Sequence, residues 1–295
     1  MTRALERWRS WAWILPGVVL LVTFVYYPVL ENIRLSFYSW NAFAPNPVFI
    51  GLENYRTALE DSVFWRALFN NTAYAVVSLV FQVGLSLVLA AIMEELVRQR
   101  LRGWLRTIYF IPATMSITVA GILFSFIYNP QIGLLNRILD AVGLDSWKHA
   151  WLGEENTAIW SIIAMSQWQS IGYTAVLFVV AIQGIPREYY EAARIDGAGP
   201  VRTFFTITVP MVREMTTLLV ILTISGAFLV FNEVMVMTAG GPDNSSQVLG
   251  TLLYRNAFFE DDMGYAATIA TVIFVITFAI AAAQIIVSRR RRLAL

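Results

Sequence analysis

The sequence predicts an all-α integral membrane protein with six transmembrane helices and both termini in the cytoplasm. Of its 295 residues, 58% are hydrophobic and 14% are charged, whereas soluble domains carry about 25% charged residues. Six uncharged runs are each long enough for the roughly 20 apolar residues that a membrane-crossing helix needs. Basic residues gather in alternate connecting segments, and this pattern predicts the orientation.

The six predicted helices follow the uncharged runs in order. Their approximate bounds are 11–30, 72–93, 107–128, 158–182, 214–237 and 265–287. A further uncharged run, 35–52, contains Asn41, Pro45, Pro47 and Gly51. We predict a loop there, because these residues break helices and leave polar backbone that lipid cannot satisfy. The first span is predicted to be a retained signal anchor, since its apolar stretch is long and no A-x-A-like cleavage site follows.

The orientation prediction depends on the basic residues, which prefer the cytoplasm when they lie in short loops. Most of the 21 basic residues fall in four alternating segments: Arg3, Arg7, Arg9, Arg98, Arg100, Arg102, Arg106, Arg187, Arg194, Arg202, Arg213, Arg289, Arg290, Arg291 and Arg292. The other loops hold most of the acidic residues. We therefore predict a cytoplasmic N-terminus (1–10), a six-helix domain (11–290) and a cytoplasmic basic tail (289–295) that anchors the last helix at the membrane surface.

The composition excludes several kinds of chemistry. The chain has no Cys and one His, His149, so thiol catalysis and Fe–S clusters are excluded, and most metal and triad chemistry with them. Its one lysine, Lys148, lies outside any G-x-x-x-x-G-K phosphate-binding loop. The net charge of +1 gives no argument for a nucleic-acid partner. We therefore expect no catalytic residue, no metal site and no nucleotide site, and any nucleotide energy must come from a partner.

The connection between the fourth and fifth spans, 184–213, is far longer than two adjacent helices require. Pro186 is typical of a first helical turn, and Gly197 is typical of the left-handed residue that ends a helix. This pattern predicts a short cytoplasmic helix over 186–196. One face of it carries Tyr189, Ala192, Ala193 and Asp196. The small alanine side chains allow another backbone to approach closely.

A second short helix is predicted from Pro200 to about Thr208, and Pro210 then begins the fifth span. The loop reads EAARIDGA over 191–198 and ITVP over 207–210, and it resembles the E-A-A-x-x-x-G-x(9)-I-x-L-P loop of ABC importer permeases. The resemblance implies a coupling helix that docks into a cleft on a separate ATP-binding subunit. The implied coupling residues are Tyr189, Glu191, Ala192, Ala193, Asp196, Gly197 and Pro210. Val209 stands where that family usually has leucine, and Glu214 stands where it often has a second proline.

Further sequence matches, spread over nearly the whole chain, indicate which subfamily of these permeases the chain resembles. They are Leu15-Pro16, Tyr27-Pro28, 49–55, Asn70-Asn71-Thr72, Ile111-Pro112, 133–136 and 238–242. This set is similar to the first-permease type of the maltose, lactose and glycerol-phosphate importers. The resemblance implies the type I ABC importer transmembrane fold in the inner membrane of a prokaryote. It also implies a second permease subunit, a dimeric ATP-binding subunit that holds ATP and Mg, and an extracytoplasmic solute-binding protein, with no cofactor in this chain.

Polar and aromatic side chains at membrane depth mark a candidate solute pathway, because they are costly against lipid. The candidates are Ser166, Gln167, Trp168, Gln169, Ser170 and Tyr173 in the fourth span and Phe228, Asn232 and Glu233 in the fifth. Hydrogen bonding between helices explains the serines and glutamines equally well. The resemblance favours the pathway, since this stretch lines the sugar site in maltose-type permeases. Glu233 lies near an outer helix end, where a solvated carboxylate at the interface is the alternative.

The leading expectation is therefore a non-catalytic permease subunit that forms half of the pathway of an ATP-driven carbohydrate importer. An importer permease for a non-sugar solute is one alternative. An ion-coupled secondary transporter is another, and it would explain the six spans and the membrane carboxylate. It would not explain the length and pattern of the 184–213 loop, and the internal repeats of many such transporters are not evident. A membrane enzyme lacks a set of catalytic residues.

Overall fold

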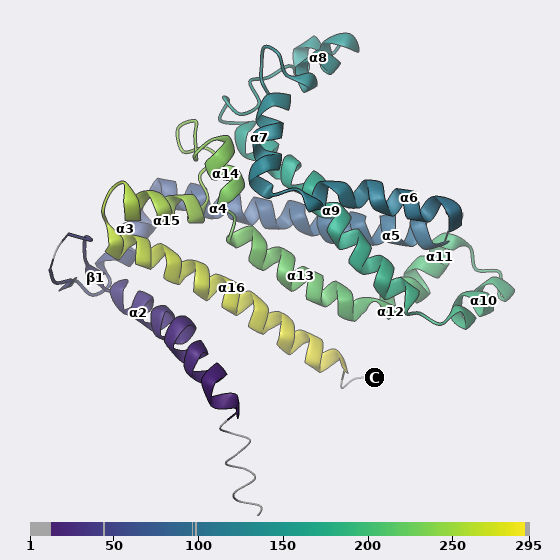
Figure 1. Cartoon of the computed structure of the whole chain (residues 1–295), viewed down its shortest axis with the longest axis horizontal. Coiled ribbons are helices and arrows are strands. Elements are labelled where there is room, and N and C mark those ends of the chain that lie inside the picture. Colours follow the sequence, from purple (N-terminus) through teal and green to yellow (C-terminus); the bar gives the residue numbers. More distant parts are fainter. Residues whose placement is uncertain (1–12, 44, 96, 98, 293–295) are drawn as a thin grey trace, which may run out of the picture. The chain divides into compact units, whose positions relative to one another are not determined.

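In the computed structural model of the chain, residues 13–43, 45–95, 97 and 99–292 are described. The predicted cytoplasmic N-terminus (1–10), Arg98 and the last tail residues (293–295) lie outside them. The chain divides into two compact units, of which unit 1 comprises Met1–Asp61 and Leu253–Phe274, and unit 2 comprises Ser62–Leu252 and Val275–Leu295. Helices dominate both units (Figure 1), as the predicted fold class requires.

Unit 1 begins with the first span, a helix over Trp13–Leu35 that contains the π-helical turn η1 (Val22–Tyr26) and α2 (Tyr27–Leu35). It is followed by β1 (Tyr38–Ser39), β2 (Val48–Phe49) and α3 (Glu53–Glu60), and the unit also holds parts of α15 (Leu249–Phe258) and α16 (Met263–Arg292). The two strands pair antiparallel with Tyr38 opposite Phe49. The uncharged run 35–52 is thus a short hairpin and not a span, as predicted.

Unit 2 contains the elements that carry the predicted site. They are α4 (Ser62–Ser78), η2 (Leu79–Leu85), α5 (Ser86–Glu95), α6 (Gln99–Phe110), η3 (Ile111–Thr114), α7 (Ile117–Ile127), α8 (Leu134–Ala141), η4 (Asp145–Trp147), α9 (Ala158–Gln183), α10 (Arg187–Ile195), α11 (Pro200–Thr203), η5 (Phe204–Thr208), α12 (Val209–Met211), α13 (Arg213–Phe228) and α14 (Asn232–Met237). The second span is one helix over Ser62–Glu95, which begins ten residues before the predicted bound of 72.

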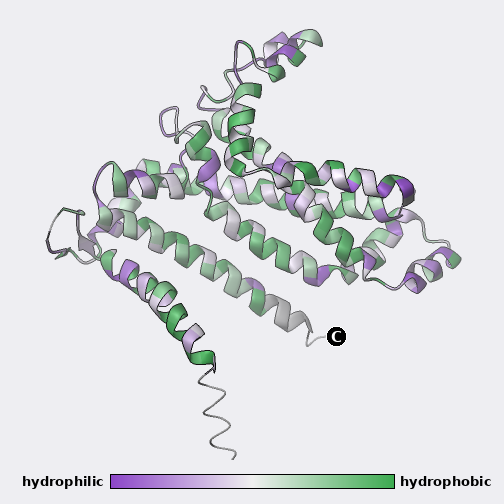
Figure 2. Cartoon of the chain, viewed as in Figure 1, coloured by the Kyte–Doolittle hydropathy of each residue, from purple (hydrophilic) through white to green (hydrophobic). Residues whose placement is uncertain are grey.

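Among the described residues, four helices are long and apolar enough to cross a membrane, and six spans result if each of two bent helix pairs is one span. Figure 2 shows the hydrophobic character of α13 and of the described part of α16. The predicted number of spans therefore agrees with the upper count. The two bent pairs correspond to the third and fifth predicted spans, which differ from the single helices that were expected.

The third span is broken near its middle. Its halves, Arg100–Thr114 and Ile117–Ile127, meet at an angle of 95°, so the prediction of one helix over 107–128 was wrong. Pro112 cannot donate a helical hydrogen bond, and Met115 has an extended backbone with ψ 145°. The sequence did not reveal the break, because the carbonyl that it frees is satisfied by a distant side chain on α9.

The fifth span is broken twice. Pro200–Met211 and Arg213–Phe228 meet at 72°, and residues 229–231 then separate α13 from α14. The prediction of one helix over 214–237 was therefore wrong. Pro210 lies in α12, before the bend, and does not begin α13 as expected.

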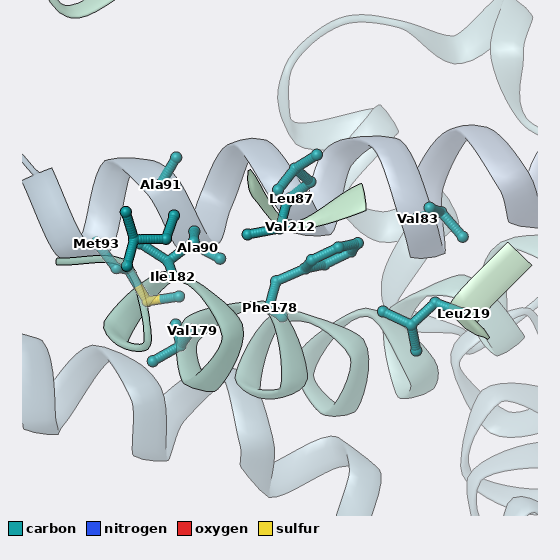
Figure 3. Close-up of a cluster of buried hydrophobic side chains, with 12 residues drawn as sticks. Val83, Leu87, Ala90, Ala91, Met93, Phe178, Val179, Ile182, Val212 and Leu219 are labelled. Atoms are coloured by element: carbon teal, nitrogen blue, oxygen red, sulfur yellow. The ribbon is translucent and has the colours of Figure 1, made fainter. Parts of the chain in front are cut away.

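The core of unit 2 lies where α5, α9 and α13 pack together (Figure 3). Its buried side chains are Val83, Leu87, Ala90, Ala91, Met93, Ala175, Phe178, Val179, Ile182, Ile185, Val212 and Leu219. The α9 members recur at helical spacing, which places them on one stripe. Because lipid gives no hydrophobic driving force between spans, close packing of this kind holds them together. The core fixes the end of α9, from which α10 follows.

A glycine permits a close approach between two helices in this unit. A Cβ atom built on Gly172 of α9 would lie 1.7 Å from the carbonyl oxygen of Tyr109 in α6. Only a residue without a side chain fits that contact, as in other tight helix crossings in membranes. Gly172 thus brings the fourth span against the first half of the third span, Arg100–Thr114.

Candidate coupling surface and solute pathway

α10 is the short helix that the sequence predicts in loop 184–213. At its end Gly197 has a φ of 73°. The N–H groups of Gly197 and Ala198 donate to the carbonyls of Arg194 and Ala193 at 3.1 and 2.8 Å. This is a Schellman closure, in which a left-handed glycine satisfies carbonyls at the helix end. The helix and its left-handed glycine are therefore confirmed.

The surface of α10 is open in this chain. Exposed among the predicted coupling residues are Tyr189, Glu191, Ala192, Asp196, Gly197 and Pro210, and Ala193 is half-buried. The side chain of Tyr189 is 51% exposed, although it is a large aromatic ring. An exposed aromatic beside small side chains is suited to a groove on another protein. The docking role of this surface is still a prediction.

Two hydroxyl groups tie α10 to the end of the second span. The hydroxyl of Tyr190 lies 3.2 Å from Oγ1 of Thr208, and Thr208 donates to Oε1 of Glu95 at 3.0 Å. Thr208 is completely buried, and burial raises the pKa of Tyr190 above its usual range. The phenol therefore stays protonated at neutral pH. A displacement of α10 would act on α5 through these contacts.

Glu94, the carboxylate next to Glu95, connects three helices, α5, α6 and α9, at the same end of unit 2. It accepts hydrogen bonds from Arg102 at 3.3 Å, from Arg106, and from Gln183 at 3.3 Å. The side chain of Glu94 is only 10% exposed. Charge-assisted hydrogen bonds of this kind are stronger than neutral ones, and low exposure reduces their screening. Glu94 thus joins the end of α5 to α6 and to the last turn of α9.

A cavity of about 840 Å³ opens between these contacts and α10. Its lining includes Glu94, Arg106, Gln183, Tyr190, Glu191 and Arg194. Glu94, Tyr190 and Thr208 were not among the predicted site residues. One signal was available, because Glu94 and Glu95 form an acidic pair within a predicted inner segment that is otherwise basic.

The polar and aromatic residues of the fourth span differ in how far they are buried. Ser166 and Gln167 are buried, Gln169 and Ser170 are half-buried, and Trp168 and Tyr173 are exposed. Gln167 donates to Oγ of Ser78 on α4 at 3.1 Å. Gln169 donates at 2.9 Å to the carbonyl of Met115, which the break in the third span leaves free. The two glutamines therefore bond to other helices in this structure.

In the fifth span, Phe228 is buried, Asn232 is exposed and Glu233 is buried. The carboxylate of Glu233 is 8% exposed and accepts a hydrogen bond from the hydroxyl of Tyr74 at 2.8 Å. The alternative of a solvated carboxylate at the interface does not hold in this structure, because Glu233 is buried and bonded to a tyrosine on α4. Its role in the pathway is still a prediction.

Apolar spans, polar side chains within them and an exposed connecting helix tied to the end of the second span are the features expected of the membrane-embedded subunit of a transport system. The family described as "Binding-protein-dependent transport system inner membrane component" matches residues 63–292. This chain belongs to that family. It is a multi-pass permease subunit of the inner membrane and a transport component, not an enzyme, and transport in the family depends on a binding protein.

Individual relatives agree with this assignment. The "Probable ABC transporter permease protein YurN" of Bacillus subtilis is 50% identical over 92% of each chain. The diacetylchitobiose uptake system permease protein NgcF of Streptomyces coelicolor is 33% identical, over 92% of this chain and 80% of its own. The fold matches a solved bacterial ABC transporter for alginate import, with a TM-score of 0.85, 23% identity and 98% of each chain covered.

Proposed function

We propose that this chain forms half of the translocation pathway for a carbohydrate or a carbohydrate derivative. Support comes from relatives whose names specify such solutes. Besides NgcF, they include the arabinooligosaccharide permease protein AraP of Halalkalibacterium halodurans, 32% identical, and the starch degradation products permease protein AmyD of Thermoanaerobacterium thermosulfurigenes, 30% identical. An ion-coupled secondary transporter is not favoured, because the chain belongs to a binding-protein-dependent family.

The proposed complex contains four kinds of component. This chain pairs with a second permease subunit, and a dimeric ATP-binding subunit binds ATP and Mg and hydrolyses the nucleotide. An extracytoplasmic solute-binding protein delivers the solute. The binding-protein partner is supported by the structurally similar alginate ABC transporter, which was solved in complex with an alginate pentasaccharide-bound periplasmic protein.

The observation that carries this proposal is the combination of an exposed α10 and its polar ties to the spans. Tyr189, Glu191 and Gly197 are exposed for docking. Behind them, the contacts of Tyr190 and Thr208 lead to α5. Closure of the ATP-binding subunits would move α10, and these ties would pass the movement to the second span. The chain itself performs no chemistry in this scheme.

Within the proposed pathway, Trp168 and Tyr173 are the residues best placed to meet a sugar ring. Both are aromatic and exposed at membrane depth, and an aromatic face packs well against the C–H surface of a sugar. Asn232 and Ser170 offer polar groups for hydroxyls. Ser166, Gln167, Gln169, Phe228 and Glu233 would then act by shaping the pathway, since they are buried or bonded to other helices.

Purification of the tagged chain from its host membrane tests the proposal. We expect an ATP-binding subunit and a second permease to co-elute, and we expect the Glu191→Ala variant to lose the ATP-binding subunit while it stays inserted. Glu188→Ala, an exposed neighbour outside the predicted coupling set, is the control. Elution of the chain without any ATP-binding subunit would contradict the proposed complex. A glycerol-3-phosphate permease, UgpA of Agrobacterium fabrum, is 31% identical, so uptake assays should include phosphorylated solutes.

A further inference from the structure

Side chains on one face of α4 form hydrogen bonds to the chain on both sides of the break between α13 and α14, residues 229–231. The face carries Asn71, Tyr74 and Ser78 at positions i, i+3 and i+7, which are neighbours on a helix. Their exposed fractions are 0%, 3% and 1%, although polar side chains are unusual inside a span. Each of the three makes a hydrogen bond within unit 2, so the face has a specific structural use.

Asn71 satisfies two helix ends at once. Its Nδ2 donates to the carbonyl of Ala227 at 2.7 Å, and its Oδ1 accepts from the N–H of Leu249 at 2.8 Å. Ala227 lies in the last turn of α13, and Leu249 begins α15. Backbone groups at helix ends lack helical partners, and lipid cannot supply them. The neighbouring Asn70 donates to Ser245 and Gln247 carbonyls at 2.8 Å each.

Tyr74 holds the other side of the same break. Its hydroxyl donates to Oε1 of Glu233 at 2.8 Å, and Glu233 lies in the first turn of α14. The chain is thus fixed at Ala227 before residues 229–231 and at Glu233 after them. Phe228 and Asn232 lie between the two fixed points.

We propose that Asn71 and Tyr74 are positioning residues of the solute pathway, which hold the broken fifth span so that Asn232 is presented to the solute. The selectivity part of this inference rests on the proposed function, whereas the positioning part does not. A hydrogen bond lost inside a protein is costly when its partner stays buried. Removal of the Tyr74 hydroxyl should therefore release α14 measurably.

The test is made in the assembled complex, and it uses the absence of cysteine from this chain. Asn232→Cys introduces a thiol whose labelling by a maleimide is followed on this chain alone. We expect Tyr74→Phe to change the labelling rate by about fivefold or more, which corresponds to the loss of one buried hydrogen bond. Tyr128→Phe is the matched control, because Tyr128 is also buried in unit 2 but its hydroxyl donates to the Ser161 carbonyl of α9, at 3.1 Å, and not to α13 or α14.

A second pair of variants keeps the inference testable if Tyr74→Phe fails to assemble. Glu233→Gln retains an oxygen that accepts the bond and should leave labelling unchanged, whereas Glu233→Ala should change it as Tyr74→Phe does. Combining Tyr74→Phe with Glu233→Ala should add nothing further. Equal labelling of the Glu233→Ala, Tyr74→Phe and parent proteins would overturn the positioning role.

The transport measurement separates this inference from the proposed function. On a background without the introduced thiol, Tyr74→Phe should alter the ratio of kcat/KM between two oligosaccharides, and Tyr128→Phe should lower complex stability without changing that ratio. An unchanged ratio together with altered labelling would leave the positioning of α14 intact and remove its link to selectivity. Failure of the parent complex to transport any sugar would contradict the proposed function and the selectivity part that rests on it, and it would leave the positioning part to the labelling result.

Discussion

Gly197 combines a conformational and a steric requirement at one residue. Its φ of 73° is costly for residues with a Cβ atom, by about 1–2 kcal/mol, whereas the space around it is open within this chain. Asparagine tolerates the left-handed conformation better than alanine does. The conformational and the steric requirement can therefore be tested separately by the choice of the residue that replaces Gly197.

We predict that Gly197→Asn leaves the stability of the chain nearly unchanged but impairs docking of the ATP-binding subunit, because it adds bulk on the exposed surface. Gly197→Ala should lower stability and impair docking less. Thermal unfolding of the purified chain and the amount of co-purified ATP-binding subunit measure the two effects. Normal docking and uptake by the Gly197→Asn variant, and also by a Gly197→Trp variant, would refute the coupling assignment.

Tyr173 and Gln169 were predicted to serve the same solute site, and their surroundings differ. Tyr173 is 53% exposed, whereas Gln169 donates to the carbonyl of Met115. We predict that Tyr173→Ala changes the relative uptake of several sugars. Gln169→Leu should lower the amount of assembled complex and so reduce the uptake of every solute by a similar factor. The reason is that the Met115 carbonyl loses its hydrogen bond, at a cost of about 1–3 kcal/mol. Uptake normalised to the amount of complex distinguishes the two, and identical relative rates for Tyr173→Ala would remove Tyr173 from the site.

At the scale of elements, Glu94 connects α5, α6 and α9 behind the coupling helix. We predict that Glu94→Gln weakens solute-stimulated ATP hydrolysis in the complex, because Arg102 and Arg106 lose their shared carboxylate. Glu60→Gln is the matched control, since it breaks an exposed pair with Arg56 and exposed pairs contribute little. Combining Glu94→Arg with Arg106→Glu should restore part of the activity. Equal activity of Glu94→Gln, Glu60→Gln and the parent complex would argue against this connection.

The sequence predicted elements well where their signals are local. α10 was located from the proline before it and Gly197 after it, and the non-helical loop in 35–52 from its helix breakers. The break at Met115 was missed, because the helix is interrupted where Gln169, far away in the sequence, satisfies the freed carbonyl. The same reason applies to Glu233. Its neighbours suggested a helix end near solvent, and only the fold brings Tyr74 to it.

At the scale of the whole molecule, runs of uncharged residues predicted six spans, and the structure agrees if each bent pair is one span. Two spans nevertheless differ from straight helices, which hydropathy cannot detect because it counts apolar residues and ignores backbone direction. The cytoplasmic placement of both termini rests on the distribution of arginines and is still a prediction. The central claim for the molecule concerns the source of energy for transport.

The most direct test of that claim is uptake of labelled oligosaccharides by proteoliposomes that contain the complete complex. We predict uptake only when ATP and Mg are present on the side of α10 and the solute-binding protein is present on the opposite side. Glu191→Ala should reduce uptake without loss of inserted chain. Uptake that proceeds without ATP, driven by a sodium or proton gradient through this chain alone, would contradict the assignment to an ATP-driven importer.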